Sequence, residues 1–211
     1  MVLAAGGRPH SHNGQSYPLP KLRATNVCCC YTACVDFVAN VPIVTIRHAR
    51  PDDLPRIVAI YNAAIPGRLA TADTSPVTVA DRQDWFRGFD PARRPLWVHC
   101  DAGDVPMAWL SLRSFYGRPA YAATVEVGVY TAPEALRQGR AVALLRHAID
   151  AMPSLGIKTL LAFVFAHNVP SLRLFERVGC VRWGLLPRVA ELDGIERDVV
   201  ILGFRHPRAA P

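Results

Sequence analysis

Lysine is nearly absent from this 211-residue chain, which has only Lys21 and Lys158 among its 24 basic residues. The arginines that make up the rest are scattered, so the formal net charge of +7 forms no basic stripe of the kind that binds nucleic acid. A modest positive field instead favours an anionic ligand that carries several phosphates. We therefore expect no nucleic-acid partner.

Long apolar runs are missing as well. The apolar stretch at residues 27–44 is interrupted by polar residues and a proline, and it is too short to span a bilayer. A signal peptide stays open as an alternative because Lys21 and Arg23 precede this stretch, although no clear small-residue cleavage site follows. We expect residues 1–42 to be a poorly ordered extension without chemistry, and the protein to be cytoplasmic with no membrane partner.

The cysteines form no disulfide framework, which fits a reducing compartment. Four of the six precede residue 40 without a histidine or a second cysteine pair at zinc-finger spacing, so we expect no metal site. The other two, Cys100 and Cys180, have no activating base nearby in the sequence. We therefore reject an acyl-cysteine intermediate.

From about residue 43 to residue 206 the pattern alternates between strand and helix, which predicts one α/β domain followed by a short tail at 207–211. The chain ends in a hairpin whose edges could pair between two subunits, so a homodimer is an expectation. The expected strands are 41–47, 96–100, 107–115, 124–130, 157–165, 181–190 and 197–204; the expected helices are 51–61, 78–87, 139–152 and one between Asn168 and Gly179.

A βαβ unit lies in the middle of this domain. Strand 124–130 is followed by helix 139–152, whose apolar residues recur at helical spacing along one face. The next segment, 157–165, is nearly all apolar, which is typical of a strand buried on both faces beside a parallel neighbour. The unit is therefore expected to be a right-handed crossover.

The loop that opens the helix of this unit could hold phosphates. Amides at a helix N-terminus have no helical acceptor, and the helix dipole favours an anion there. Small residues at Gly139 and Ala141 let a phosphate approach the backbone, and Arg137 and Arg140 add charge on either side of Gln138. The dinucleotide fingerprint and the nucleotide P-loop are both absent.

Strand 125–130, followed by Gly139-x-Ala141 and Leu144-Leu145, resembles the coenzyme A motif of the GNAT superfamily of N-acetyltransferases. That family's loop reads Gln/Arg-x-x-Gly-x-Gly/Ala. The run from Asn168 through Ser171 to Gly179 is similar to the family's following helix. Residues 70–74 and 124–130 look more like the phosphinothricin and methionine-sulfoximine acetyltransferase branch, and the likeness covers about residues 44–204.

The resemblance implies a GNAT fold, with a mixed central sheet of six or seven strands flanked by about four helices. It implies acetyl-coenzyme A as co-substrate, no metal, and direct attack by a small-molecule amine in a ternary complex. The sequence departs from the family at Leu136, where Gln or Arg is usual, and at Phe175, which cannot act as a proton donor. The residues expected to bind the coenzyme are Val127, Gly128, Val129, Arg137, Gln138, Gly139, Arg140, Ala141, Asn168 and Ser171.

Glu126 is the candidate catalytic base, because an amine acceptor must lose a proton before it attacks. On an alternating strand it shares a face with Gly128 and Tyr130, and desolvation there would make the carboxylate a stronger base. The alternative is a structural carboxylate paired with an arginine. Gly128 suits a strand that splays at this point, or an ordinary bulge.

Acceptor recognition is expected in residues 69–74 and in the loop that contains Phe115, Tyr116, Arg118 and Tyr121. Arg118 could hold a carboxylate of an amino-acid-like acceptor with two hydrogen bonds, or it could be a solvated loop residue. A second hypothesis is a non-catalytic acyl-coenzyme A binder that senses or regulates. The departures from the family pattern keep it open.

Overall fold

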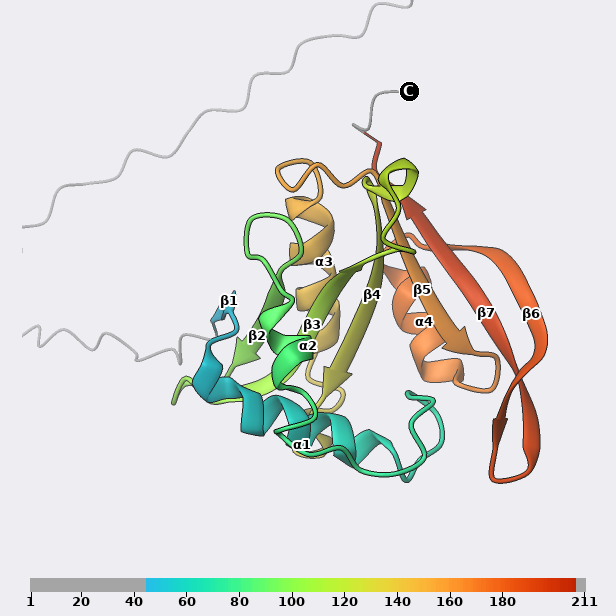
Figure 1. Cartoon of the computed structure of the whole chain (residues 1–211), viewed down its shortest axis with the longest axis horizontal. Helices are drawn as coiled ribbons and strands as arrows, with labels where there is room; N and C mark the ends of the chain where they lie inside the picture. The colour runs from blue at the N-terminus through green and yellow to red at the C-terminus, as the bar shows by residue number, and fades with distance from the viewer. Residues whose placement is uncertain (1–44, 208–211) are drawn as a thin grey trace, which may run out of the picture. The chain divides into compact units, whose positions relative to one another are not determined.

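The computed structural model describes residues 45–207, so the expected extension at 1–42, with four of the cysteines, and residues 208–211 lie outside the described residues. Figure 1 shows the arrangement of the helices and strands. The elements in chain order are β1 (Ile46–His48), a 3₁₀ turn (Pro51–Asp53), α1 (Leu54–Ala64), α2 (Gln83–Arg87), β2 (Leu96–Cys100), β3 (Pro106–Ser114), a 3₁₀ turn (Pro119–Tyr121), β4 (Thr124–Thr131), a 3₁₀ turn (Pro133–Ala135), α3 (Arg140–Ala151), β5 (Thr159–Phe165), α4 (Val169–Arg177), β6 (Val181–Leu192) and β7 (Ile195–Arg205).

The strands form one mixed sheet of seven strands in the order β1-β2-β3-β4-β5-β7-β6. Only the pair β4 and β5 is parallel, and it is joined by α3 as the βαβ pattern predicts. The other neighbours are antiparallel, and β7 lies between β5 and the edge strand β6. The predicted mixed sheet of six or seven strands with about four helices is therefore confirmed.

Two apolar cores lie on the two faces of this sheet. On one face α3 and α4 pack against β3, β4 and β5 through residues such as Leu145, Phe175 and Leu112. On the other face α1 and the neighbourhood of α2 pack against β2 and β3 around Ile57 and Trp109 (Figure 1). Successive strand residues point to opposite faces, so β2 and β3 contribute to both cores: Trp97 and Leu110 lie in the first, and Val98 and Trp109 lie in the second.

The structure corrects several boundaries. The helix expected at 78–87 is only the short α2, because Thr78 and Asp81 exchange hydrogen bonds that close a separate turn before it. The first strand begins at Ile46, and part of its expected range lies outside the described residues.

On α3, the ring of His147 packs edge-on against Trp97, with the ring centroids 4.8 Å apart. Burial, and then the nearby His48, lowers the pKa of His147.

Within residues 45–207, we find no helix with the length and apolar character needed to cross a membrane.

Candidate functional site

The parallel strands β4 and β5 separate in the middle of the sheet. Their pairing stops at Glu126 and Leu161, although β4 runs on to Thr131 and β5 to Phe165. The register between β3 and β4 shows no shift, so Gly128 forms no bulge with β3. A cavity of about 370 Å³ opens where the strands diverge, and residues 126–130 and 162–165 line its two sides.

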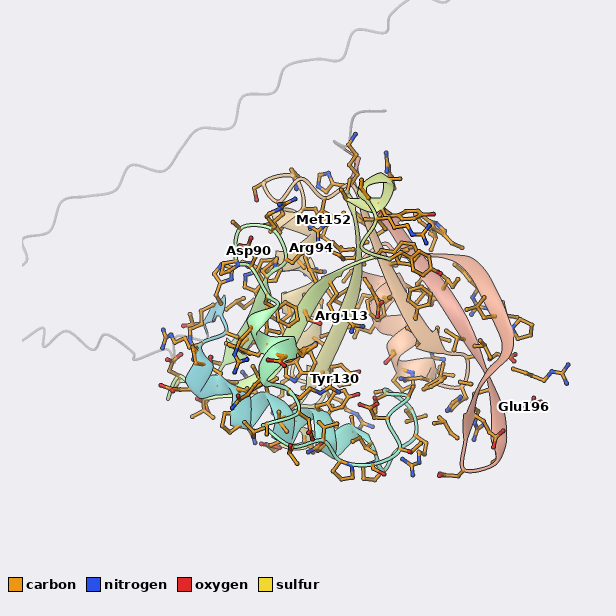
Figure 2. The ribbon with its side chains drawn as sticks, in the orientation of Figure 1. Asp90, Arg94, Arg113, Tyr130, Met152 and Glu196 are labelled. Atoms are coloured by element: carbon orange, nitrogen blue, oxygen red, sulfur yellow. The ribbon has the colours of Figure 1, made fainter. Side chains whose placement is uncertain are left out.

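Three cross-strand pairs of β3 and β4 make the floor of this cavity. Directly opposed residues of an antiparallel pair place their side chains on the same face of the sheet. Figure 2 labels Arg113 and Tyr130, which come from these two neighbouring strands. We call the six residues the cavity floor: Trp109 opposite Tyr130, Ser111 opposite Gly128, and Arg113 opposite Glu126.

The charged end of the floor is an ion pair. Arg113 Nη2 donates to Glu126 Oε1 at 2.6 Å. The Glu126 side chain is 33% exposed, so it is partly buried, and it is paired with an arginine as the structural alternative expects. Its role as the catalytic base stays a prediction. The sequence alone did not single out Arg113. Its place opposite Glu126 follows from the strand register, which needs the three-dimensional pairing.

The other end of the floor is aromatic and leads to a second ion pair. The rings of Trp109 and Tyr130 stack with their centroids 4.5 Å apart. Beyond them the Tyr61 hydroxyl donates to Asp73, and Arg82 donates to the same carboxylate at 2.9 Å. The Arg82 guanidinium also lies 4.5 Å from the centre of the Tyr61 ring. Burial, and then the bond to Asp73, raises the pKa of Tyr61.

Residues 69–73 form one wall of the cavity, and distant segments hold them in place. We call this segment, together with the preceding Arg68, the 68–73 loop. The Asn168 side-chain amide donates to Leu69 O at 2.9 Å, and the Tyr130 hydroxyl donates to Ala70 O at 3.0 Å.

The 68–73 loop is held at its start as well. A ring nitrogen of His167 lies 2.9 Å from Arg68 O. The Arg68 guanidinium makes two hydrogen bonds to Asp193 in the β6–β7 turn, at 2.8 and 3.1 Å. The backbone of this wall is therefore fixed before any ligand binds.

The N-terminus of α3 has the features of an anion site. Gly139 precedes the helix with a φ of 77°, and Arg137 has a φ of 61°. An added Cβ at Gly139 would meet nothing within 4 Å, so the approach to this backbone is open. Within the described chain, the amides of residues 140–142 donate to no carbonyl, and the first hydrogen bond of the helix runs from the Ala143 amide to Gly139 O. Such amides favour a phosphate.

The side chains around this turn partly bond to the protein itself. Arg140 donates to Cys100 O at 3.2 Å and lies 3.0 Å from His99 Nδ1, so its guanidinium ties α3 to β2. Gln138 donates through its side-chain amide to Glu134 O at 3.0 Å. The expected added charge at the loop therefore comes from the exposed Arg137, while Arg140, Ala141 and Gln138 offer backbone groups.

The start of α4 reaches the same cavity. Asn168 is buried and accepts a hydrogen bond from the Ser171 amide at 3.1 Å, which caps the helix. Asn168, Ser171 and Phe175 all line the cavity. Phe175 is 4% exposed, whereas Leu136 is 57% exposed.

The aromatic loop before β4 lies outside the cavity lining. Phe115 packs against Tyr116 and Tyr121, with ring centroids 4.2 and 5.5 Å apart. Its link to the cavity is Phe163, a lining residue whose ring lies 6.3 Å from that of Phe115. The structure thus brings Leu69 to Asp73 into the cavity wall but leaves Phe115, Tyr116, Arg118 and Tyr121 at its margin.

Burial raises the pKa of the Cys100 and Cys180 thiols to about 11, so neither is a ready nucleophile. Neither residue lines the cavity. Among residues 45–207, no group of three or more histidine, cysteine, aspartate or glutamate side chains is placed to bind a metal ion.

Two diverging parallel strands, joined by a helix whose first amides have no acceptor among the described residues, fit an acyltransferase of the coenzyme A-dependent class. The family model described as the acetyltransferase (GNAT) family matches residues 57–180, and the chain belongs to this family. The resemblance inferred from the sequence is therefore confirmed.

Individual relatives agree with this assignment. Over 159 residues the chain is 48% identical to a Bacillus subtilis protein named "Putative phosphinothricin acetyltransferase YwnH", covering 75% of this chain and 97% of that protein. It is 30% identical over 169 residues to the L-methionine sulfoximine/L-methionine sulfone acetyltransferase of Pseudomonas paraeruginosa, covering 79% and 98%. The structure of yncA from Salmonella typhimurium, with its cofactor acetyl-CoA, superposes with a TM-score of 0.73 at 26% identity, covering 80% and 97%.

Proposed function

We propose that this N-acetyltransferase transfers the acetyl group of acetyl-coenzyme A to the amine of a small, amino-acid-like acceptor by direct attack in a ternary complex. The observation that carries the proposal is the cavity between β4 and β5. It brings the edge of β4 that has no ladder partner in β5 together with a floor that contains an ion pair. The relatives named for phosphinothricin and methionine sulfoximine support an amino-acid-like acceptor.

The residues present suit acetyl-coenzyme A. The amides at the start of α3, with the exposed Arg137 beside Gly139, would hold the diphosphate. The edge of β4 at Val127 to Val129, which has no ladder partner in β5, would hold the pantetheine arm. Asn168 and Ser171 complete this side of the cavity. The coenzyme supplies a thioester, whose carbonyl carbon accepts a nucleophile.

The protein's own groups then perform three tasks. Backbone N–H groups of the open β4 edge stabilise negative charge on the carbonyl oxygen as it develops. The Glu126 carboxylate, which is partly exposed to the cavity, takes a proton from the attacking amine. Arg113 fixes the position of that carboxylate through the bond of 2.6 Å. The sulfur leaves as a thiolate, a leaving group that water can protonate.

The experiment follows the release of free coenzyme A thiol with a panel of acceptors: L-methionine sulfoximine, L-methionine sulfone, phosphinothricin, common amino acids and spermidine. The Glu126→Gln variant should lose turnover by about 100-fold or more, because the amide cannot take a proton and forms no ion pair with Arg113. It should still bind acetyl-coenzyme A, because the backbone groups proposed to hold the coenzyme are unchanged. Glu176→Gln, an exposed change on α4 outside the cavity lining, is the control. Donor binding with no turnover of any acceptor would overturn the proposal in favour of an acyl-coenzyme A sensor.

A further inference from the structure

The middle of the cavity floor holds a hydroxyl group that has no hydrogen-bond partner in the described part of the protein and is open to the cavity. Ser111 is 3% exposed and lines the cavity. Its Oγ makes no hydrogen bond with any residue from 45 to 207. Among residues 45–207 only Arg197 Nε is both buried and unpartnered, so Ser111 Oγ is accessible from the cavity. A hydroxyl in this position is satisfied by a water molecule or by a ligand in the cavity.

The residue opposite Ser111 leaves space for such a ligand. Ser111 pairs with Gly128 across the β3–β4 ladder. A Cβ at position 128 would lie 3.2 Å from Ser111 Oγ, and glycine leaves that position empty. The hydroxyl therefore borders a notch in the floor, between the stacked rings of Trp109 and Tyr130 and the ion pair of Arg113 with Glu126.

The notch lies on the face of the sheet that packs against α1. Leu110 and Leu112, the neighbours of Ser111 on β3, pack in the core beneath α3 and α4. Because side chains alternate along a strand, Ser111 points to the opposite face, with Trp109, whose core includes α1. The free β4 edge that suits the thioester lies within the sheet, whereas Ser111 Oγ projects out of it.

We propose that Ser111 is a catalytic residue that binds the amine nitrogen of the acceptor, an inference that rests on the proposed function. The hydroxyl oxygen accepts one N–H of the amine and orients the nitrogen lone pair towards the thioester carbon. A second N–H proton passes to the Glu126 carboxylate as the C–N bond forms. The C–S bond then breaks, sulfur leaves with the electron pair, and solvent protonates the thiolate. Ser111 keeps its own proton throughout.

The test is steady-state kinetics of Ser111→Ala, with acetyl-coenzyme A and whichever of L-methionine sulfoximine, L-methionine sulfone and phosphinothricin turns over fastest. We expect kcat/KM for the acceptor to fall about 10- to 100-fold, the loss of one hydrogen bond in the transition state. The KM for acetyl-coenzyme A should change less than twofold, and Tm should not fall, because the variant loses an unpaired polar group. Ser111→Thr, which keeps the hydroxyl, should recover most of the activity.

Ser114→Ala is the matched control, since it removes a hydroxyl from the same strand that accepts a hydrogen bond from Arg94 and lies outside the cavity lining. Wild-type kinetics in Ser111→Ala would overturn the inference while leaving the proposed function intact. A rise in the KM for acetyl-coenzyme A equal to the loss for the acceptor, or a fall in Tm that accounts for the loss, would also overturn it. If the wild-type enzyme turned over none of these acceptors, the proposed function would be refuted, and this inference would be refuted with it.

Discussion

Asn168→Ala removes two hydrogen bonds at once, because Asn168 caps α4 and also holds the 68–73 loop. Loss of the cap costs about 1 kcal/mol. The Leu69 carbonyl loses its donor, which costs about another 1 kcal/mol for a partly buried group. The variant should therefore be less stable by about 2 kcal/mol, which corresponds to a fall in Tm of about 4–8 °C for a domain of this size.

Asn168→Asp separates the two roles. A carboxylate still accepts from the Ser171 amide and suits a helix N-terminus, but it cannot donate to Leu69 O. Its stability should lie between those of the wild type and Asn168→Ala. Both variants should raise the KM for the acceptor, because the loop they release lines the cavity.

Chemical denaturation measures the stability, and initial rates at saturating acetyl-coenzyme A measure the acceptor KM. Ser154→Ala, which removes a hydrogen bond to Ala151 O outside the cavity lining, is the control for a generic loss of one contact. If Asn168→Asp were as unstable as Asn168→Ala, or if it kept the wild-type acceptor KM, the assignment of two separate roles to Asn168 would be refuted.

Two further predictions concern the glycine before α3 and the buried thiols. Gly139→Ala should lower the stability by about 1–2 kcal/mol, since φ is 77° at this position, and should raise the KM for acetyl-coenzyme A. Gly156→Ala is the control, because Gly156 also has a positive φ, of 66°, and open space around it. This variant should lose the same stability but keep the wild-type KM for acetyl-coenzyme A. If the two variants had equal KM values for acetyl-coenzyme A, the role of the α3 turn would be contradicted. Since burial raises the pKa of Cys100 and Cys180 to about 11, peptide mapping should find both resistant to iodoacetamide at pH 8 and increasingly reactive as the pH rises towards that value. Rapid labelling of either in the folded protein at pH 8 would be inconsistent with the burial.

The fold could be predicted from the sequence because its central unit carries strong local signals. The apolar face of α3 and the apolar run of β5 each repeat over many residues, so tertiary context hardly alters them. The prediction of a helix at 78–87 was wrong over its first residues. Thr78, with Asp81 three positions later, is as typical of a turn as of a helix cap.

The site could be predicted only where its residues are consecutive. Val127 to Val129 and the turn at Gly139 are contiguous segments, and the structure places them at the strand edge and the helix start. The places of Ser111 and Arg113 in the site could not be predicted from the sequence, because they depend on the residues opposite them. Only the β3–β4 register defines those residues. Arg82 meets Asp73 across nine positions of irregular chain, where no periodicity gives the pairing.

The ties of the 68–73 loop have a consequence for how the protein is made. Asn168 and His167 follow their partners in this loop by 99 positions, and Asp193 follows Arg68 by 125. At a translation rate of roughly 5–20 residues per second, the loop leaves the ribosome several seconds before the groups that hold it. A nascent chain thus exposes its strands and first helix long before one wall of the pocket is anchored. The hydrogen bonds that hold this wall are complete only once the turn between β6 and β7 has been synthesised.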